Sequence, residues 1–106
     1  MVSYNNHQWR KLRSLKIAAD PLCEYCLHHK KVTEAQEVDH VIPPTDNNDP
    51  LFYEYENLLS TCRRCHIDIT HKQQSIKDTL NKLSFEEAKK LKLSLTNPRV
   101  NVDGYY

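Results

Sequence analysis

A chain of 106 residues has room for one domain with a modest hydrophobic core, so a bound metal ion would contribute substantially to its stability. The first residues are polar and basic, without the apolar run of a secretory signal, and no stretch is apolar enough to cross a membrane. Composition therefore argues against an exported or membrane-embedded protein, and we expect a cytoplasmic one without membrane partners.

The net charge of +1 conceals a segregation of charge along the chain. Residues 1–31 hold six Lys and Arg against two acids, residues 32–61 hold seven acids and no Lys or Arg, and residues 62–106 hold nine Lys and Arg against five acids. Basic flanks around an acidic centre suit a protein that contacts phosphates at its periphery and a divalent cation at its centre. Such runs also occur on ordinary solvated surfaces, so charge alone does not decide between the two readings.

The first half of the chain predicts one long helix and one strand. Residues 5–19 have the periodicity of a basic amphipathic helix with Trp9, Leu12 and Leu15 on its apolar side, and Asp20-Pro21 ends it. The first cysteine pair then lies in a tight turn. Residues 32–42 are predicted as a strand or hairpin, closed by two prolines, and residues 45–50 are a loop by composition.

The second half predicts two helices. Residues 51–59 are aromatic and apolar enough to return to the core as a strand or an irregular packed segment. A helix, continuous or broken, follows from about 63 to 83 and is capped by Ser60 or Thr61. Ser84 and Glu87 form a capping box for a last helix over 84–96, and residues 97–106 resemble a tail. These elements predict a small α+β domain over 1–96, with its core at 20–76.

Four cysteines occur as two Cys-x-x-Cys pairs, Cys23/Cys26 and Cys62/Cys65, with 35 residues between the inner two. Their number and pairing match a closed tetrahedral zinc site. A disulfide framework or a redox dithiol would use the same residues, but a reducing cytosol favours metal binding.

Acidic, imidazole and amide side chains lie between and beside these pairs. Asp39 and His66 would give a divalent ion two ligands and leave its other positions open for water and phosphate. Adjacent strand residues face opposite sides, so His40 is available for another task, and its imidazole can accept a proton from water near neutral pH. Asn57 is suited to orient the backbone or imidazole of that base. Together these residues have the equipment for phosphodiester hydrolysis.

In this order, the motifs resemble the HNH endonucleases, specifically the small four-cysteine type of phages and bacteria. The resemblance covers about residues 8–72 and is carried by five segments: Trp9–Arg13 leading to Asp20–Cys23, Cys23–Cys26, Val38–Pro43, Asn57-Leu58 and Cys62–His66. It implies a ββα-metal (His-Me finger) core with zinc knuckles and flanking helices, acting on DNA. Phage or restriction-system proteins would be further partners, in the bacterial host cytoplasm.

The resemblance also assigns roles to individual residues. It implies that His40 is the general base, that Asn57 orients the segment bearing it, and that Asp39 and His66 bind the catalytic ion, Mg²⁺ or another divalent cation such as Mn²⁺, Ni²⁺ or Zn²⁺. Cleavage would leave a 5′-phosphate and a 3′-hydroxyl. The chain lacks the glycine that often follows the first knuckle, and Thr70 stands where some relatives hold another histidine ligand. His71 is about 100° from that face of the helix, and its role stays open.

Five basic residues are the expected phosphate contacts: Lys11, Arg13, Arg63, Arg64 and Lys72. Two other functions remain as alternatives. A zinc-stapled nucleic-acid-binding module without catalysis would need only the knuckles and the basic flanks. A zinc-ribbon adaptor for protein contacts would need only the cysteines. The Asp39-His40 pair favours the nuclease over both, because neither alternative requires it.

Overall fold

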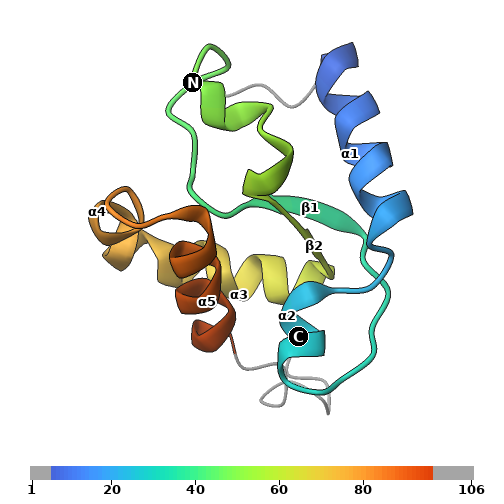
Figure 1. Cartoon of the computed structure of the whole chain (residues 1–106). Helices are drawn as coiled ribbons and strands as arrows, with labels where there is room; N and C mark the ends of the chain where they lie inside the picture. The colour runs from blue at the N-terminus through green and yellow to red at the C-terminus, as the bar shows by residue number, and fades with distance from the viewer. Residues whose placement is uncertain (1–5, 97–106) are drawn as a thin grey trace.

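Helices surround a two-stranded sheet in residues 6–96, the part of the chain that this computed structural model describes (Figure 1). The elements, with η for 3-10 helices, are α1 (His7–Ala19), α2 (Glu24–His28), β1 (Glu37–His40), η1 (Pro50–Phe52), η2 (Tyr55–Asn57), β2 (Leu58–Thr61), α3 (Arg63–Gln73), η3 (Gln74–Ile76), α4 (Lys77–Leu80) and α5 (Phe85–Leu95).

The expected α+β class is confirmed. The expected tail, 97–106, lies outside the described residues. No helix within 6–96 has the length and apolarity that crossing a bilayer requires.

The sheet is an antiparallel pair in which Asp39 lies opposite Leu59 and His40 opposite Leu58. In the described part of the chain β1 pairs only with β2, so its other edge is unpaired. The strand is shorter than the 32–42 expected, because the chain before it makes only an isolated bridge between Leu22 and Glu34.

Helix α1 begins at a polar cap and packs on the sheet through one aromatic residue. The Asn6 side chain accepts a hydrogen bond from the Trp9 amide at 2.7 Å, which satisfies a free N–H of the first turn. Trp9 is buried, whereas Leu15, expected on the same side, is 55% exposed. The expectation for Leu15 was wrong because Lys16 takes the buried position one turn below Leu12 and pairs with Asp20 and Glu24.

The segment before β2 is irregular, as one of the two expectations had it. Asp49 caps η1 by accepting from the Leu51 amide at 3.0 Å, and η2 leads directly into β2. The following helical region is broken into α3, η3 and α4. Ser60 and Thr61, expected to cap it, lie in β2 instead, and Cys62 is the N-terminal cap residue of α3.

Helix α5 starts at the predicted capping box. Ser84 Oγ accepts from the Glu87 amide and Glu87 Oε1 accepts from the Ser84 amide, both at 3.1 Å. The helix packs on the core through Ala88, Leu91 and Leu95.

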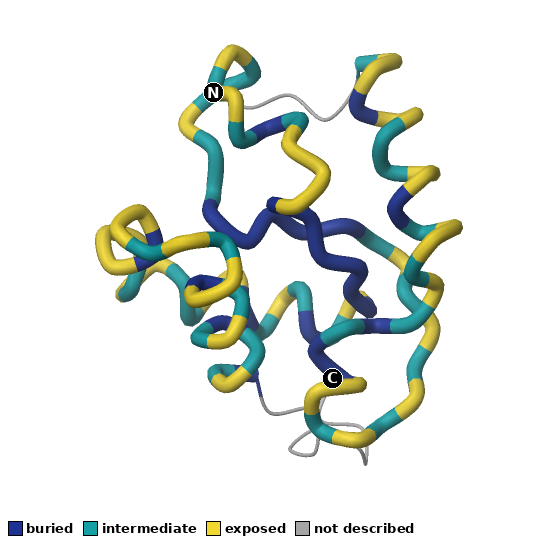
Figure 2. Tube along the Cα trace, viewed as in Figure 1, coloured by how far each residue is buried: buried dark blue, intermediate teal, exposed yellow. Residues whose placement is uncertain are grey.

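Two apolar clusters lie on opposite sides of the sheet, which is itself buried (Figure 2). The larger contains the cysteines together with Tyr25, Val41, Leu59, Ile69, Leu80 and Ala88. The smaller contains Trp9, Val38, Phe52 and Leu58. Since successive strand residues face opposite sides, the Asp39 side chain lies on the side of the larger cluster and that of His40 on the side of the smaller.

Candidate active site and metal centre

The four cysteines meet in one buried group although 35 residues separate the two pairs. Their sulfur atoms all lie within 4.8 Å of one another, with Cys26 Sγ at 3.9 Å from Cys62 Sγ and 3.7 Å from Cys65 Sγ. Sulfur ligands bound at about 2.3 Å to a tetrahedral ion lie about 3.8 Å apart. None of the four forms a disulfide. Hydrogen bonds among the four thiols lower the pKa of Cys23 and Cys62, which favours the thiolate form, and raise the pKa of Cys26 and Cys65. The group can hold a metal ion.

In the turn after the first cysteine pair, Lys30 occupies the left-handed position for which a glycine was expected. The Lys31 amide donates to the Cys26 carbonyl at 2.9 Å and the Lys30 amide to the Leu27 carbonyl at 2.9 Å, which is the Schellman pattern of a helix end. Lys30 has φ 62°, a left-handed conformation that glycine adopts at less cost. The motif fixes the backbone of Cys26, one of the four cysteines that could hold a metal ion.

Two aromatic side chains pack against the His40 ring. Trp9 stacks on its ring with centroids 5.1 Å apart, and Phe52 packs at 5.2 Å. Its Nε2 lies 2.9 Å from the Phe52 carbonyl oxygen. Since a carbonyl can only accept, Nε2 carries the proton and the lone pair of the neutral ring is on Nδ1. Burial lowers the pKa of His40 despite the opposing effect of that hydrogen bond, so the ring stays neutral and can accept a proton.

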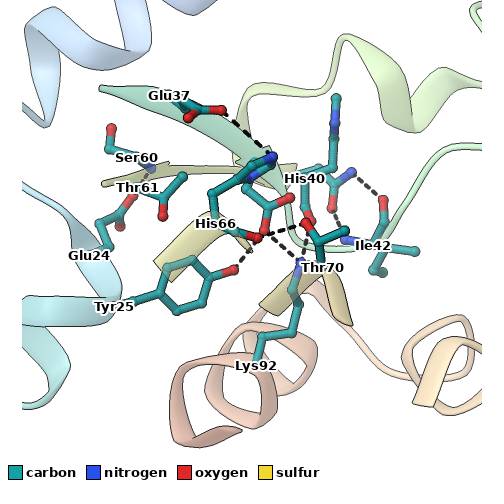
Figure 3. Close-up of polar contacts among 12 residues, drawn as sticks. Glu24, Tyr25, Glu37, His40, Ile42, Ser60, Thr61, His66, Thr70 and Lys92 are labelled. Atoms are coloured by element: carbon teal, nitrogen blue, oxygen red, sulfur yellow. Dashed lines mark hydrogen bonds and ion pairs between the residues drawn. The ribbon is translucent and has the colours of Figure 1, made fainter. Parts of the chain in front are cut away.

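Asp39 is buried and makes two short contacts through a single oxygen. Its Oδ2 accepts from the Tyr25 hydroxyl at 2.7 Å and from Lys92 Nζ at 2.9 Å (Figure 3). Neither contact reaches Oδ1. Burial by itself would raise the pKa of Asp39, but the Lys92 ammonium and then Tyr25 outweigh it, so the pKa is lowered and Asp39 is a carboxylate.

His66, on the first turns of α3, has one ring nitrogen beside an acid and the other without a partner. Its Nε2 lies 3.7 Å from Glu37 Oε1 (Figure 3), which favours the tautomer with the proton on Nε2. Its Nδ1 is buried, and no group in the described part of the chain hydrogen-bonds to it. A histidine that ligates a metal typically has its other N–H directed at a carboxylate, so this arrangement fits a cation at Nδ1.

Asn57 joins the chain after β1 to the loop before β2. Its side chain is fully buried, accepts from the Ile42 amide at 2.8 Å, and donates to the carbonyls of Ile42 and Leu51 at 2.9 and 3.0 Å. Its backbone carbonyl accepts from the Val41 amide at 2.7 Å. The residue therefore fixes the chain immediately after His40.

The catalytic candidates border one pocket of about 330 Å³. It is lined by Trp9, Arg13, Glu37, Val38, Asp39, His40 and His66. All four residues of β1 line it and none of β2 does, so it lies along the unpaired edge of β1. At that edge the side chains from both faces of the strand meet, which explains how Asp39 and His40 reach one site.

Two further pockets adjoin this one and are lined by cationic side chains. A pocket of about 430 Å³ shares Glu37 and His66 with it and adds Arg63. A pocket of about 370 Å³ shares Arg63 with the second and adds Lys31 and Arg64 beside the cysteines. We call this series of pockets the track.

The structure brings three of the five expected phosphate contacts to the track: Arg13, Arg63 and Arg64. Lys11 lines a separate hollow beside Leu12 and Tyr53. Lys72 bonds to Asp68 and to the Leu95 carbonyl, where it holds the end of α5. His71 is exposed on α3.

Sequence reasoning missed Lys31, Glu37, Tyr25 and Lys92 at this site. Glu37 lies two residues before Asp39 and so shares its side of the strand, which is a usable local signal. Lys92 follows Ala88 by one turn of α5, so a charged residue on an apolar stripe was the signal for it.

This geometry agrees with what the chain is similar to among known proteins. The family model for HNH endonucleases matches residues 23–73. Among solved structures, the chain is similar to the crystal structure of the HNH endonuclease of the deep-sea thermophilic bacteriophage GVE2 with manganese ion. The two are 32% identical, with a TM-score of 0.56, over 68% of this chain and 78% of that chain. The chain belongs to the HNH endonuclease family.

This HNH endonuclease is therefore a metal-dependent nuclease, and the resemblance inferred from its motifs is confirmed. No curated protein matches the chain. Its helix α5 lies beyond the matched residues 23–73, yet its Lys92 contacts Asp39 of the candidate site.

Proposed function

We propose that this chain is a DNA endonuclease that hydrolyses phosphodiester bonds at the unpaired edge of β1. The observation that carries the proposal is the pocket itself, in which a neutral buried histidine, a buried carboxylate and an imidazole nitrogen without a partner among residues 6–96 border one cavity. A module that only binds nucleic acid would not require these three groups together.

Two metals would have separate duties. A structural Zn²⁺ would occupy the four-cysteine group, whose sulfur spacing fits it. Asp39 Oδ1 and His66 Nδ1 would hold a catalytic divalent ion, Mg²⁺ or another such as Mn²⁺, Ni²⁺ or Zn²⁺. When bound, that ion would polarise the phosphoryl group and stabilise negative charge on the leaving oxygen.

His40 would act as the general base. Its Nδ1 accepts a proton from water as the water oxygen forms a bond to phosphorus in line with the leaving oxygen. The bond from phosphorus to the 3′ oxygen breaks and that oxygen takes a proton from solvent water, which leaves a 5′-phosphate and a 3′-hydroxyl. The Phe52 carbonyl would fix the ring in the required tautomer, and Trp9 would fix its plane. Asn57 would orient the segment that bears the base.

The DNA backbone would run along the track, from the scissile phosphate towards the cysteines. Arg13 would contact phosphate beside the reacting group, and Arg63, Arg64 and Lys31 would contact phosphates towards the cysteines. Such contacts position the strand without reading its bases.

The test is cleavage of plasmid DNA by zinc-loaded protein with Mg²⁺, Mn²⁺, Ni²⁺ or added Zn²⁺. We expect the wild type to nick or linearise DNA with at least one of these ions. His40→Ala should lose roughly 100-fold to 10,000-fold in rate, the range for losing a general base. His71→Ala is the matched control, because it removes an exposed imidazole from α3, and should keep wild-type activity.

Zinc content and circular dichroism of both variants show whether the fold survives. A wild type that cuts under none of these ions would overturn the nuclease proposal, and retention of DNA by that inactive protein would favour the binding module. Full activity in His40→Ala would overturn the assignment of the base alone.

A further inference from the structure

The ammonium group of Lys92 lies against the carboxylate proposed to bind the catalytic ion. Its side chain is 0% exposed. Its Nζ donates to Asp39 Oδ2 at 2.9 Å and to the His40 carbonyl at 2.6 Å (Figure 3). A cation from α5 thus contacts both members of the Asp39-His40 pair.

Packing of α5 does not explain a lysine at this position. The helix meets the core through apolar residues, and position 92 lies one turn beyond the fully buried Ala88, where an apolar side chain would pack. A buried ammonium is strongly unfavourable unless it is paired and hydrogen-bonded. Asp39 is also buried, with 8% of its side chain exposed, and each group is the counterion of the other.

We propose that Lys92 is a positioning residue that serves as a resident cation of the active site, holding Asp39 in place without metal and weakening the intrinsic affinity for the catalytic ion. The inference rests on the proposed function, in which Asp39 and His66 are the ligands. Lys92 and Tyr25 both engage Oδ2, so Asp39 presents Oδ1 to the ion and binds it through one oxygen.

Charge balance sets the direction of the effect. Of the other charged groups that line the pocket, Glu37 and Arg13 cancel each other, so Asp39 with a neutral His66 would present one negative charge to the ion, and Lys92 cancels it. A divalent ion would then enter a group with no net charge, next to a fixed ammonium. A DNA phosphate supplies the missing negative charge, so the ion and the substrate should each strengthen the binding of the other.

The experiment measures Mn²⁺ binding to zinc-loaded protein by electron paramagnetic resonance, which reports free Mn²⁺ independently of cleavage. Lys92→Met should bind Mn²⁺ at least about tenfold more tightly than the wild type, because a fixed positive charge beside the ion is removed. Lys92→Gln, which is neutral but keeps a hydrogen-bond donor, should shift in the same direction. Lys90→Met, an exposed lysine on the same helix, is the control and should not change the affinity.

Removing Asp39 shows whether the effect passes through its carboxylate. In an Asp39→Asn background, adding Lys92→Met should give a clearly smaller gain in affinity than it gives in the protein that keeps Asp39. Mn²⁺ should also raise the melting temperature of Lys92→Met more than that of the wild type, since only the variant has a buried carboxylate lacking a cation. Short duplex DNA should tighten Mn²⁺ binding in His40→Ala protein more than in His40→Ala with Lys92→Met.

Two results would overturn the inference. One is equal or weaker Mn²⁺ affinity in both Lys92 variants, and the other is a gain that persists undiminished in the Asp39→Asn background. Equal affinity in the wild type and Asp39→Asn would instead remove Asp39 from the ligands, so the proposed metal site would fail before Lys92 is considered.

Discussion

Replacing Asn57 by alanine is expected to reduce the stability of the fold substantially. The variant loses three side-chain hydrogen bonds, to the Ile42 amide, the Ile42 carbonyl and the Leu51 carbonyl. At about 1 kcal/mol net for each bond, the loss is about 3 kcal/mol, and buried partners left unsatisfied add to it. For a domain of this size that corresponds to a fall of roughly 15 °C in melting temperature.

Urea unfolding followed by circular dichroism measures this loss directly. Asn81→Ala is the matched control, because Asn81 is exposed and its side chain makes no hydrogen bond within residues 6–96, so its effect should stay within about 0.5 kcal/mol. Cleavage by Asn57→Ala should also fall at temperatures where the variant is still folded, since the chain after His40 loses its tether. The reasoning would be refuted if the unfolding free energy of Asn57→Ala lay within about 1 kcal/mol of the wild-type value, because that difference corresponds to the loss of a single hydrogen bond.

Three further predictions concern the metal centre, the knuckle turn and the base. Cys65→Ser should lose stoichiometric zinc and cooperative unfolding, whereas His71→Ala should keep both, as zinc analysis and thermal melts will show. Lys30→Gly should stabilise the fold by about 0.5–1 kcal/mol by relieving a left-handed residue, while Lys90→Gly inside α5 should destabilise it by about 1 kcal/mol; equal effects in urea unfolding would contradict the turn assignment. Because burial lowers the pKa of His40, the stability that its neutral ring contributes is fully present above the unfolded pKa of about 6.5 and is lost as pH falls through the lower folded value. The acidic limb of the cleavage profile should likewise lie below pH 6.5, and a limb above it would argue against His40 as the base.

Much of the fold was predictable because its signals are local. The capping box at Ser84 and Glu87, the proline that ends α1 and the two cysteine pairs each span a few residues, and each occurs where expected. The prediction that Leu15 is buried was wrong because helical periodicity alone does not show which of two neighbouring residues faces the core. Lys16 takes the buried position because its ammonium pairs with two acids, Asp20 and Glu24.

The motifs of the candidate site were predictable from the sequence, and the residues that surround it were less so. Asp39, His40, Asn57 and His66 stand in recognisable patterns, and the structure brings three of them to one pocket, while Asn57 bonds to Ile42, two residues after His40. Lys92 contacts Asp39 although the two are 53 positions apart in the sequence. Trp9 stacks on His40 although the first cysteine pair and α2 lie between them in the chain. Such contacts follow from how α1 and α5 dock on the sheet, which no local pattern encodes.

The docking of α5 also limits how this nuclease can be reused. Residues 23–73 contain the cysteines and every catalytic candidate, and for protein engineering they look like a portable cassette. Cut out or grafted without α5, that cassette would keep the Asp39 carboxylate in an apolar setting and lose the ammonium that neutralises it, along with the cover over Ile69. The unit that can be transplanted therefore extends at least to Lys92, and α1 belongs to it as well, because Trp9 stacks on His40, the proposed base.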